Sequence, residues 1–166
     1  MKRAAVVGVM GACDGARAED VKTAFQLGKA VAENGWVLLS GGRNAGVMDA
    51  VNKGAKSAGG LTIGIVPDAN KNSLSDAVDV GIVSGMGSAR NYINVLSSDV
   101  VIACGHGGAG TASEIALALK SKKPVVLLNN RDESVAFFRS VGGDLIHCAG
   151  SVADAIALVR TLLAKV

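Results

Sequence analysis

Short apolar runs rich in β-branched residues alternate with helical patterns from one end of the sequence to the other. Runs that are apolar on both faces are typical of parallel strands covered by helices on each side. Right-handed crossovers then give a single doubly wound, Rossmann-like α/β sheet. The predicted strands cover residues 3–10, 36–40, 61–66, 79–83, 99–104, 124–128 and 144–148. The predicted helices cover residues 18–34, 46–58, 88–97, 109–120, about 132–139 and 152–164, with Ser151 capping the last.

The length of 166 residues predicts one domain, residues 1–166, that buries a core without disulfides. Three cysteines, Cys13, Cys104 and Cys148, show no paired spacing, so we expect a reducing, cytoplasmic environment. No apolar stretch approaches the ~20 residues that a membrane span needs. A net charge of +3 and only 3% aromatic residues argue against a nucleic-acid-binding face.

Glycine-rich loops follow several of the predicted strands. Because the carboxyl ends of parallel strands share one edge of a sheet, these loops are expected to lie together, at the edge where such sheets bind ligands. Glycine-rich turns that open a helix let backbone N–H groups point at a phosphate. The alternative is a set of ordinary tight turns with close helix packing. The loops are GVMGACDG (8–15), SGGRNAG (40–46), SGMGSAR (84–90) and CGHGGAG (104–110).

The segment from Gly105 to Gly110 also matches the dinucleotide pattern G-x-G-x-x-G. In a dinucleotide-binding fold this pattern follows the first strand, and an acidic residue ends the second strand. Here the pattern follows the fifth predicted strand, and the second ends in Ser40-Gly41-Gly42. The chain is therefore a poor fit for a hydride-transfer enzyme, and a small phosphorylated anion is the better prediction.

Four segments resemble the lysine-decarboxylase-like, or Lonely Guy, family. They are VVGVMGA (6–12), SGGRNAGVMDAV (40–51), GSARN (87–91), which stands near the family's catalytic M-H-x-R-K, and GGAGTASE (107–114). The best-known branch contains cytokinin-activating nucleoside 5'-monophosphate phosphoribohydrolases. That resemblance implies a phosphate held by Gly107, Gly108, Gly110 and Thr111. It also implies that Arg90 and Glu114 face the ribose.

The chain departs from that branch at its catalytic motif. His106 replaces the proline before the double glycine, Asn91 replaces the lysine after the arginine, and Gly87-Ser88 replaces Met-His. The chain is more similar to a second branch of the fold, the molybdenum cofactor carrier proteins of the algal type. This resemblance implies a non-catalytic homotetramer that binds, stores and protects molybdopterin for molybdoenzymes. The phosphoribohydrolase remains the alternative, and a single-stranded-DNA-processing protein of related fold is a third hypothesis.

The candidate residues are those of the glycine-rich loops and of the helix starts beside them. A cation such as Arg90 at a helix start is disfavoured by the helix dipole, so a bound anion would explain it, whereas a solvated arginine is the alternative. Glu114 could equally serve the dipole of its own helix. No metal site is predicted, and Cys104 is expected to be a buried strand residue. The predicted cofactor-binding residues are Gly8, Gly11, Ser40, Gly41, Gly42, Arg43, Arg90, His106, Gly107, Gly108, Gly110, Thr111 and Glu114.

The predicted helices 88–97 and 109–120 carry apolar residues whose side chains could have either of two roles. Their side chains could contact other copies of the chain, or they could pack on their own sheet. These residues are Tyr92, Ile93, Val95, Leu117 and Leu119.

Overall fold

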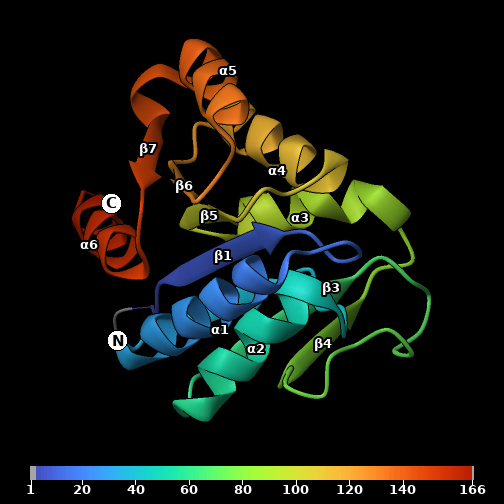
Figure 1. Cartoon of the computed structure of the whole chain (residues 1–166). Coiled ribbons are helices and arrows are strands. Elements are labelled where there is room, and N and C mark those ends of the chain that lie inside the picture. Colours follow the sequence, from blue (N-terminus) through green and yellow to red (C-terminus); the bar gives the residue numbers. More distant parts are fainter. Residues whose placement is uncertain (1–2, 166) are drawn as a thin grey trace.

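The computed structural model describes residues 3–165 and contains a seven-stranded, all-parallel sheet of order β4-β3-β2-β1-β5-β6-β7 (Figure 1). The doubly wound α/β prediction is confirmed. The strands are β1 (Val6–Gly11), β2 (Val37–Ser40), β3 (Thr62–Val66), β4 (Val80–Val83), β5 (Val100–Cys104), β6 (Val125–Leu128) and β7 (Ile146–Ala149). The helices are α1 (Ala18–Glu33), α2 (Gly46–Ser57), α3 (Arg90–Ser97), α4 (Ala109–Lys120), α5 (Asp132–Gly142) and α6 (Val152–Leu163).

The central strand β1 marks the point where the direction of winding reverses. The chain moves outward from β1 through β2 and β3 to β4, then returns to pair β5 with the other side of β1. The register places Val9 opposite Ser40 on one side and opposite Ile102 on the other. In open α/β sheets, the crevice at such a switch point is the usual ligand-binding position.

Helices cover both faces of the sheet, and each layer encloses its own part of the core. Helices α1, α2 and α6 pack on one face, with Leu27, Val51 and Val159 fully buried. Helices α3, α4 and α5 pack on the other, with Val95 and Ile115 among the buried residues. Burial of this apolar surface, at about 25 cal/mol per Å², is the main force that holds the layers together.

Two glycines allow α1 and α2 to approach each other closely. A Cβ atom at Gly28 would lie 1.9 Å from the Val51 carbonyl oxygen, and one at Gly54 would lie 1.9 Å from the Phe25 carbonyl oxygen. Neither position has room for a side chain. The two helices that follow β1 and β2 are thereby held together, and so are the loops that precede them.

Two local features differ from the sequence-based prediction. Helix α5 continues to Gly142, beyond the predicted end at residue 139. The helix predicted over residues 88–97 begins at Arg90 instead, because Ser88 lies in a 3-10 turn, η1 (Gly87–Ala89), and α3 has no side-chain cap. The predicted cap of the last helix is confirmed, since Ser151 Oγ accepts a hydrogen bond of 3.1 Å from the Asp154 backbone N–H.

The connection between β3 and β4 forms no helix, as predicted for residues 67–78. Strand β4 consequently exposes apolar side chains, with Val80 and Ile82 46% and 43% exposed. Most of the apolar helix residues with two possible roles pack internally. Val95 is buried, and Ile93, Leu117 and Leu119 pack against the core that contains it, whereas Tyr92 does not. Among residues 3–165, no helix is both long and apolar enough to span a membrane.

Candidate functional site

A cavity of about 470 Å³ opens at the carboxyl edge of the sheet, next to the switch point between β1 and β5. Its walls are the loops after β1, β2 and β5, together with η1, α3 and the first turn of α4. The predicted convergence of the glycine-rich loops therefore occurs. The predicted residues that line the cavity are Gly11, Gly41, Arg43, Arg90, Gly107, Gly108, Gly110, Thr111 and Glu114.

The first turn of α4 forms one wall of this cavity. The helix begins after Gly108, which is extended (φ −154°) and provides no side-chain cap. The first N–H groups of a helix have no partner within it, so this turn presents free donors and the positive end of the helix dipole. A Cβ atom at Gly108 or Gly110 would meet nothing within 4 Å, whereas Gly107 has a positive φ of 63° and lies against Thr111. The turn is thus an open cradle for an anion.

Arg90, the first residue of α3, lies deep in the same cavity. It is only 7% exposed, and its Nε has no hydrogen-bond partner among residues 3–165. Gly41 makes room for it, since a Cβ there would lie 2.9 Å from Arg90 Nη2. Burial lowers the pKa of the Arg90 guanidinium, and Glu114 only partly offsets this effect. A buried cation with an unpaired donor is costly without an anionic partner.

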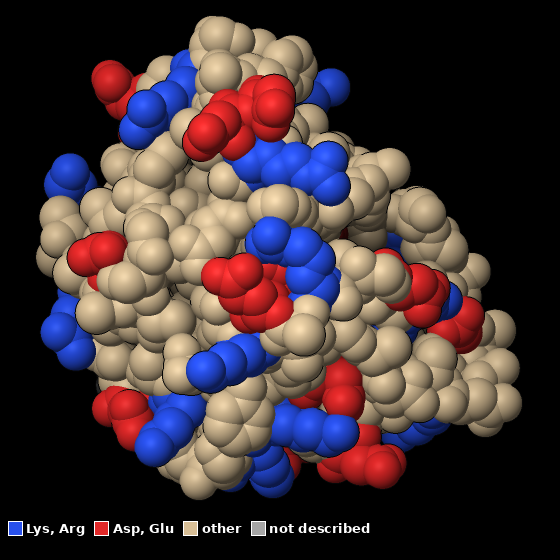
Figure 2. Space-filling view, in the orientation of Figure 1, with Lys and Arg blue, Asp and Glu red and all other residues tan. Residues whose placement is uncertain are grey.

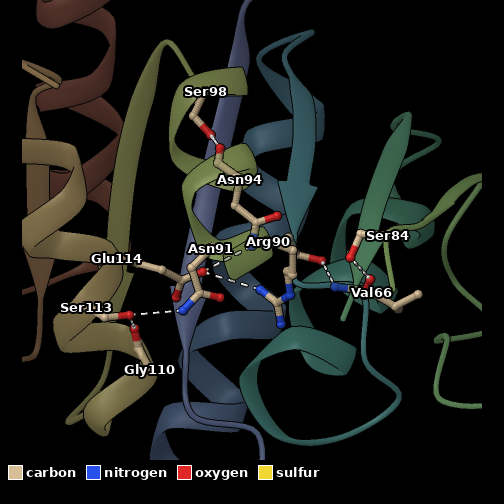
Figure 3. A network of polar contacts seen from close by, with 11 residues as sticks. Val66, Ser84, Arg90, Asn91, Asn94, Ser98, Gly110, Ser113 and Glu114 are labelled. Carbon is tan, nitrogen blue, oxygen red and sulfur yellow. Dashed lines mark hydrogen bonds and ion pairs between the residues drawn. The ribbon is translucent and has the colours of Figure 1, made fainter. Parts of the chain in front are cut away.

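Glu114 lies opposite Arg90, in the second turn of α4 (Figure 3). Its Oε1 accepts a 3.0 Å hydrogen bond from Asn94 Nδ2 and lies 3.5 Å from Arg90 Nη1. Burial raises the pKa of the Glu114 carboxyl group, while Asn94 and Arg90 act in the opposite direction. The 3.5 Å separation makes the ion pair a weak one, so Arg90 keeps donor capacity for a ligand.

A second contact joins α3 to α4 beside this pair. Asn91 Nδ2 donates a 3.0 Å hydrogen bond to Ser113 Oγ, and that hydroxyl donates a 2.7 Å bond to the Gly110 carbonyl oxygen (Figure 3). Asn91 occupies the position of the family's lysine. Its amide is therefore engaged in holding the two helices together at the mouth of the anion cradle.

The wall formed by the loop after β2 carries the second cation. Arg43 Nη2 lies 3.7 Å from Asp68 Oδ1, and both side chains are about one-third exposed. Arg43 also forms an isolated antiparallel bridge with Leu74, which fixes residues 67–78 against the loop. Figure 2 shows acidic and basic side chains interspersed on the visible face. Arg43 and Arg90 are the two arginines that line the cavity.

Four predicted residues do not line this cavity. Gly8 lies in β1, where a Cβ would meet Ser98 Oγ at 2.1 Å, and Gly42 (φ +72°) lies against the backbone of β3. Ser40 is fully buried and donates to Asn52 Oδ1 at 3.1 Å. His106 lines a neighbouring hollow of about 320 Å³ on the other side of the 107–108 turn. These four residues lie within or beside the glycine-rich loops but do not face the cavity.

The loop that carries His106 is anchored by a buried aspartate that the sequence analysis did not identify. Asp20 is 3% exposed, forms two hydrogen bonds with Arg17 (3.0 and 2.6 Å), and accepts the His106 backbone N–H at 3.3 Å. Burial alone would raise the pKa of Asp20, but Arg17 and the His106 N–H together hold it below its ordinary value. A Cβ at Gly105 would overlap this carboxylate, at 2.3 Å from its carbon.

Several further residues line the cavity but were not among the predicted cofactor-binding residues, although some of them lie within the segments that resemble the family. Asp14 and Cys13 belong to the predicted loop 8–15, so their position in that loop was the available signal. Cys104, by contrast, is fully buried in β5 as expected. The additional lining residues include Met10, Ala12, Cys13, Asp14, Met48, Pro67, Asp68, Ser88 and Asn91.

Two solved structures are similar to this chain over its whole length. The molybdenum cofactor binding protein of the phototrophic bacterium Rippkaea orientalis is 52% identical, with a TM-score of 0.96 and coverage of 98% of this chain and 99% of that one. The Moco carrier protein of Chlamydomonas reinhardtii is also 52% identical, with a TM-score of 0.93 and coverage of 99% and 100%. The resemblance to molybdenum cofactor carrier proteins of the algal type is confirmed.

A curated enzyme is more distantly similar. The cytokinin riboside 5'-monophosphate phosphoribohydrolase of Mycobacterium tuberculosis is 32% identical over 111 residues, which are 66% of this chain and 59% of the enzyme. The match thus spans less than two thirds of that enzyme. Residues 4–156 match the model of the SLOG cluster4 family. From the fold, the glycine-rich cavity and this match together, the chain belongs to the SLOG cluster4 family.

Proposed function

We propose that this chain binds the molybdenum cofactor, stores and protects it, and releases it unchanged to molybdoenzymes. The observation that carries the proposal is the 52% identity to two cofactor-binding relatives over nearly the full length of each chain. The cavity at the carboxyl edge of the sheet is the proposed binding site, because the anion cradle at the start of α4 and both arginines, Arg43 and Arg90, line it.

The cavity chemistry suits a ligand that is anionic at more than one point. The terminal phosphate of the cofactor would accept hydrogen bonds from the first N–H groups of α4, next to Gly108 and Gly110. Arg90, whose Nε has no partner among residues 3–165, would donate to a second anionic group. Arg43 lines the same cavity and adds a second positive charge. The oxo-molybdenum dithiolene provides the negative charge that these two arginines would balance.

The proposal of a non-catalytic carrier is supported by the side chains near Arg90. The family's lysine is replaced by Asn91, whose amide is bound to Ser113. The Met-His pair is replaced by Gly87 and Ser88, which form the turn η1. The chain thus has neither the cation nor the imidazole that the hydrolase motif places beside its arginine.

A phosphoribohydrolase is the second candidate, and one observation favours it. Arg90 and Glu114 face each other across 3.5 Å in the cavity, and burial raises the pKa of the Glu114 carboxyl group. A carboxyl group with a raised pKa can serve as a general acid near neutral pH. Release of free base from AMP or a cytokinin ribotide, abolished in Glu114→Gln, would establish this activity. The carrier proposal predicts no release above that of a protein-free control.

Protection of the cofactor tests the carrier proposal directly. Freshly released cofactor is incubated in air with the protein, and the fraction still able to reconstitute a cofactor-free molybdoenzyme is followed over time. The carrier proposal predicts a longer half-life with the wild-type protein than with the Arg90→Met variant or serum albumin. Equal half-lives in all three samples would contradict it.

The expected homotetramer remains a prediction. The exposed apolar side chains Val80 and Ile82 on β4, with Tyr92 and Leu96 on α3, are where contacts between copies are expected. Sedimentation equilibrium measures the mass in solution directly. A mass equal to that of one chain across the micromolar range would contradict the prediction.

A further inference from the structure

The ligand cavity continues past Arg43 into a second hollow of about 430 Å³. The two hollows share four lining residues, Cys13, Asp14, Arg43 and Asp68. The second hollow is otherwise lined mainly by amides and a hydroxyl group from the loop after β2 and from the segment 67–78. It includes Ala45, which caps the start of α2, and it differs from the first hollow in its three asparagine amides, which both donate and accept hydrogen bonds.

Of the two carboxylates that both hollows share, Asp68 is already engaged. Its Oδ2 accepts a hydrogen bond from Ser73 Oγ, and its Oδ1 lies 3.7 Å from Arg43 Nη2. Asp14, in the exposed turn after β1, has no hydrogen-bond or ion-pair partner among residues 3–165. A free carboxylate at the junction of the two hollows accepts paired donors best, since its two oxygens can each take one N–H.

The first hollow independently points to an anionic ligand. Arg90 is 93% buried there, and its Nε is unpartnered among the described residues. A ligand that fills both hollows therefore has an anionic end near Arg90 and α4, and a hydrogen-bond-donating end near Asp14. The 2-amino-4-oxopyrimidine ring of a pterin has such an end, because its ring N–H and its 2-amino group lie side by side. Adenine lacks this edge, since its 6-amino group lies beside a ring nitrogen that only accepts.

We propose that Asp14 recognises the 2-amino-4-oxopyrimidine edge of the bound ligand, and that this contact selects phosphorylated pterins against adenine nucleotides. This inference rests on the proposed function, and it adds Asp14 as the residue that would recognise the pterin ring system. Guanine carries the same edge, so guanosine 5'-monophosphate is a second ligand that Asp14 would favour over AMP.

Binding of three probes by isothermal titration calorimetry tests this proposal. The probes are a pterin with a phosphorylated side chain, guanosine 5'-monophosphate and AMP. The proteins are wild type, Asp14→Asn and, as a control, Asp76→Asn. Asp76 is exposed and lies outside the cavities described above. Asn has the size of Asp but replaces one acceptor with a donor, so the variant keeps the shape of the loop.

We expect Asp14→Asn to weaken the binding of the phosphorylated pterin and of guanosine 5'-monophosphate by about tenfold or more. The affinity for AMP should stay within about twofold of that of wild type. The control should bind all three like wild type. Equal losses for all three probes, unchanged pterin binding in Asp14→Asn, or no pterin binding by wild type would overturn the proposal. A parallel measurement with released molybdenum cofactor distinguishes failure of the role of Asp14 from failure of the proposed function. If wild type and Asp14→Asn bind the cofactor equally well, the role of Asp14 is contradicted and the proposed function stands. If wild type does not bind it, the proposed function itself fails.

Discussion

Replacement of Arg90 by methionine should separate ligand affinity from stability. Arg90 is 93% buried, its ion pair with Glu114 is stretched to 3.5 Å, and its Nε is unpartnered among residues 3–165. The guanidinium is thus desolvated without full compensation in the ligand-free protein. Methionine has a similar volume and fits an apolar site, and Glu114 can take up a proton because burial already raises its pKa.

Removal of one partner from a well-formed buried ion pair costs about 3–5 kcal/mol, but a poorly paired charge can be replaced by an apolar side chain at little cost. We therefore expect Arg90→Met to change the free energy of unfolding by no more than about 1 kcal/mol. Hydrogen bonds to charged groups contribute about 1.5–3 kcal/mol each. Loss of one such bond to the ligand corresponds to roughly 10- to 150-fold weaker binding of the molybdenum cofactor.

The assay pairs chemical denaturation of the ligand-free protein with cofactor binding followed by pterin fluorescence. Arg160→Met is the matched control, since Arg160 is exposed on α6, lines none of the cavities described above, and its side chain donates from Nε to Asn34 Oδ1 at 2.8 Å. The reasoning would be refuted if Arg90→Met bound the cofactor like wild type. It would also be refuted if the variant lost more than about 3 kcal/mol of stability, because Arg90 would then be a structural residue.

Three further predictions concern other parts of the chain. Gly28→Ala should destabilise the protein by about 2 kcal/mol or more, because its Cβ would lie 1.9 Å from the Val51 carbonyl oxygen. Gly110→Ala, whose Cβ would meet no atom within 4 Å, should keep the thermal stability of wild type and weaken ligand binding. Lys56 and Thr62 hold the pKa of Asp79 below its ordinary value, so the stability difference between wild type and Asp79→Asn should be present at pH 7 and shrink in acid, as the pH falls through that lowered pKa. A difference that stays constant as the protein is acidified would contradict this. Burial raises the pKa of the Cys104 thiol to about 12, so iodoacetamide at pH 8 should leave it unmodified in the native protein, as peptide mass mapping would show.

The arrangement of the sheet was predictable because its strands are apolar on both faces. The runs that end at Gly11 and Cys104 contain no polar residue, which is typical of parallel strands covered by helices on both faces. The exposed edge strand β4 was identified for the same reason, although its exposure could not be foreseen. That exposure depends on residues 67–78 forming no helix over it, which is a property of the tertiary structure.

The candidate site was predicted at its glycines and arginines and missed at its supporting residues. Gly108 and Arg90 belong to motifs, and the topology brings them to one cavity. Gly8 was included because it lies near a glycine loop, but its role is to accommodate Ser98 Oγ. Asp20 and Asp14 carry no motif. A buried anchor and a free carboxylate look the same in the sequence, because both are simply aspartates that follow a glycine-rich strand end.

The most direct test of the account is gel filtration of the protein mixed with freshly released molybdenum cofactor, with excess AMP in a parallel run. Pterin fluorescence after oxidation and molybdenum content are measured across the protein peak. We expect both to co-elute with the protein, at about one cofactor per chain, and excess AMP not to displace them. Absence of co-elution, or complete displacement by AMP, would contradict this expectation and favour a nucleotide-binding enzyme instead.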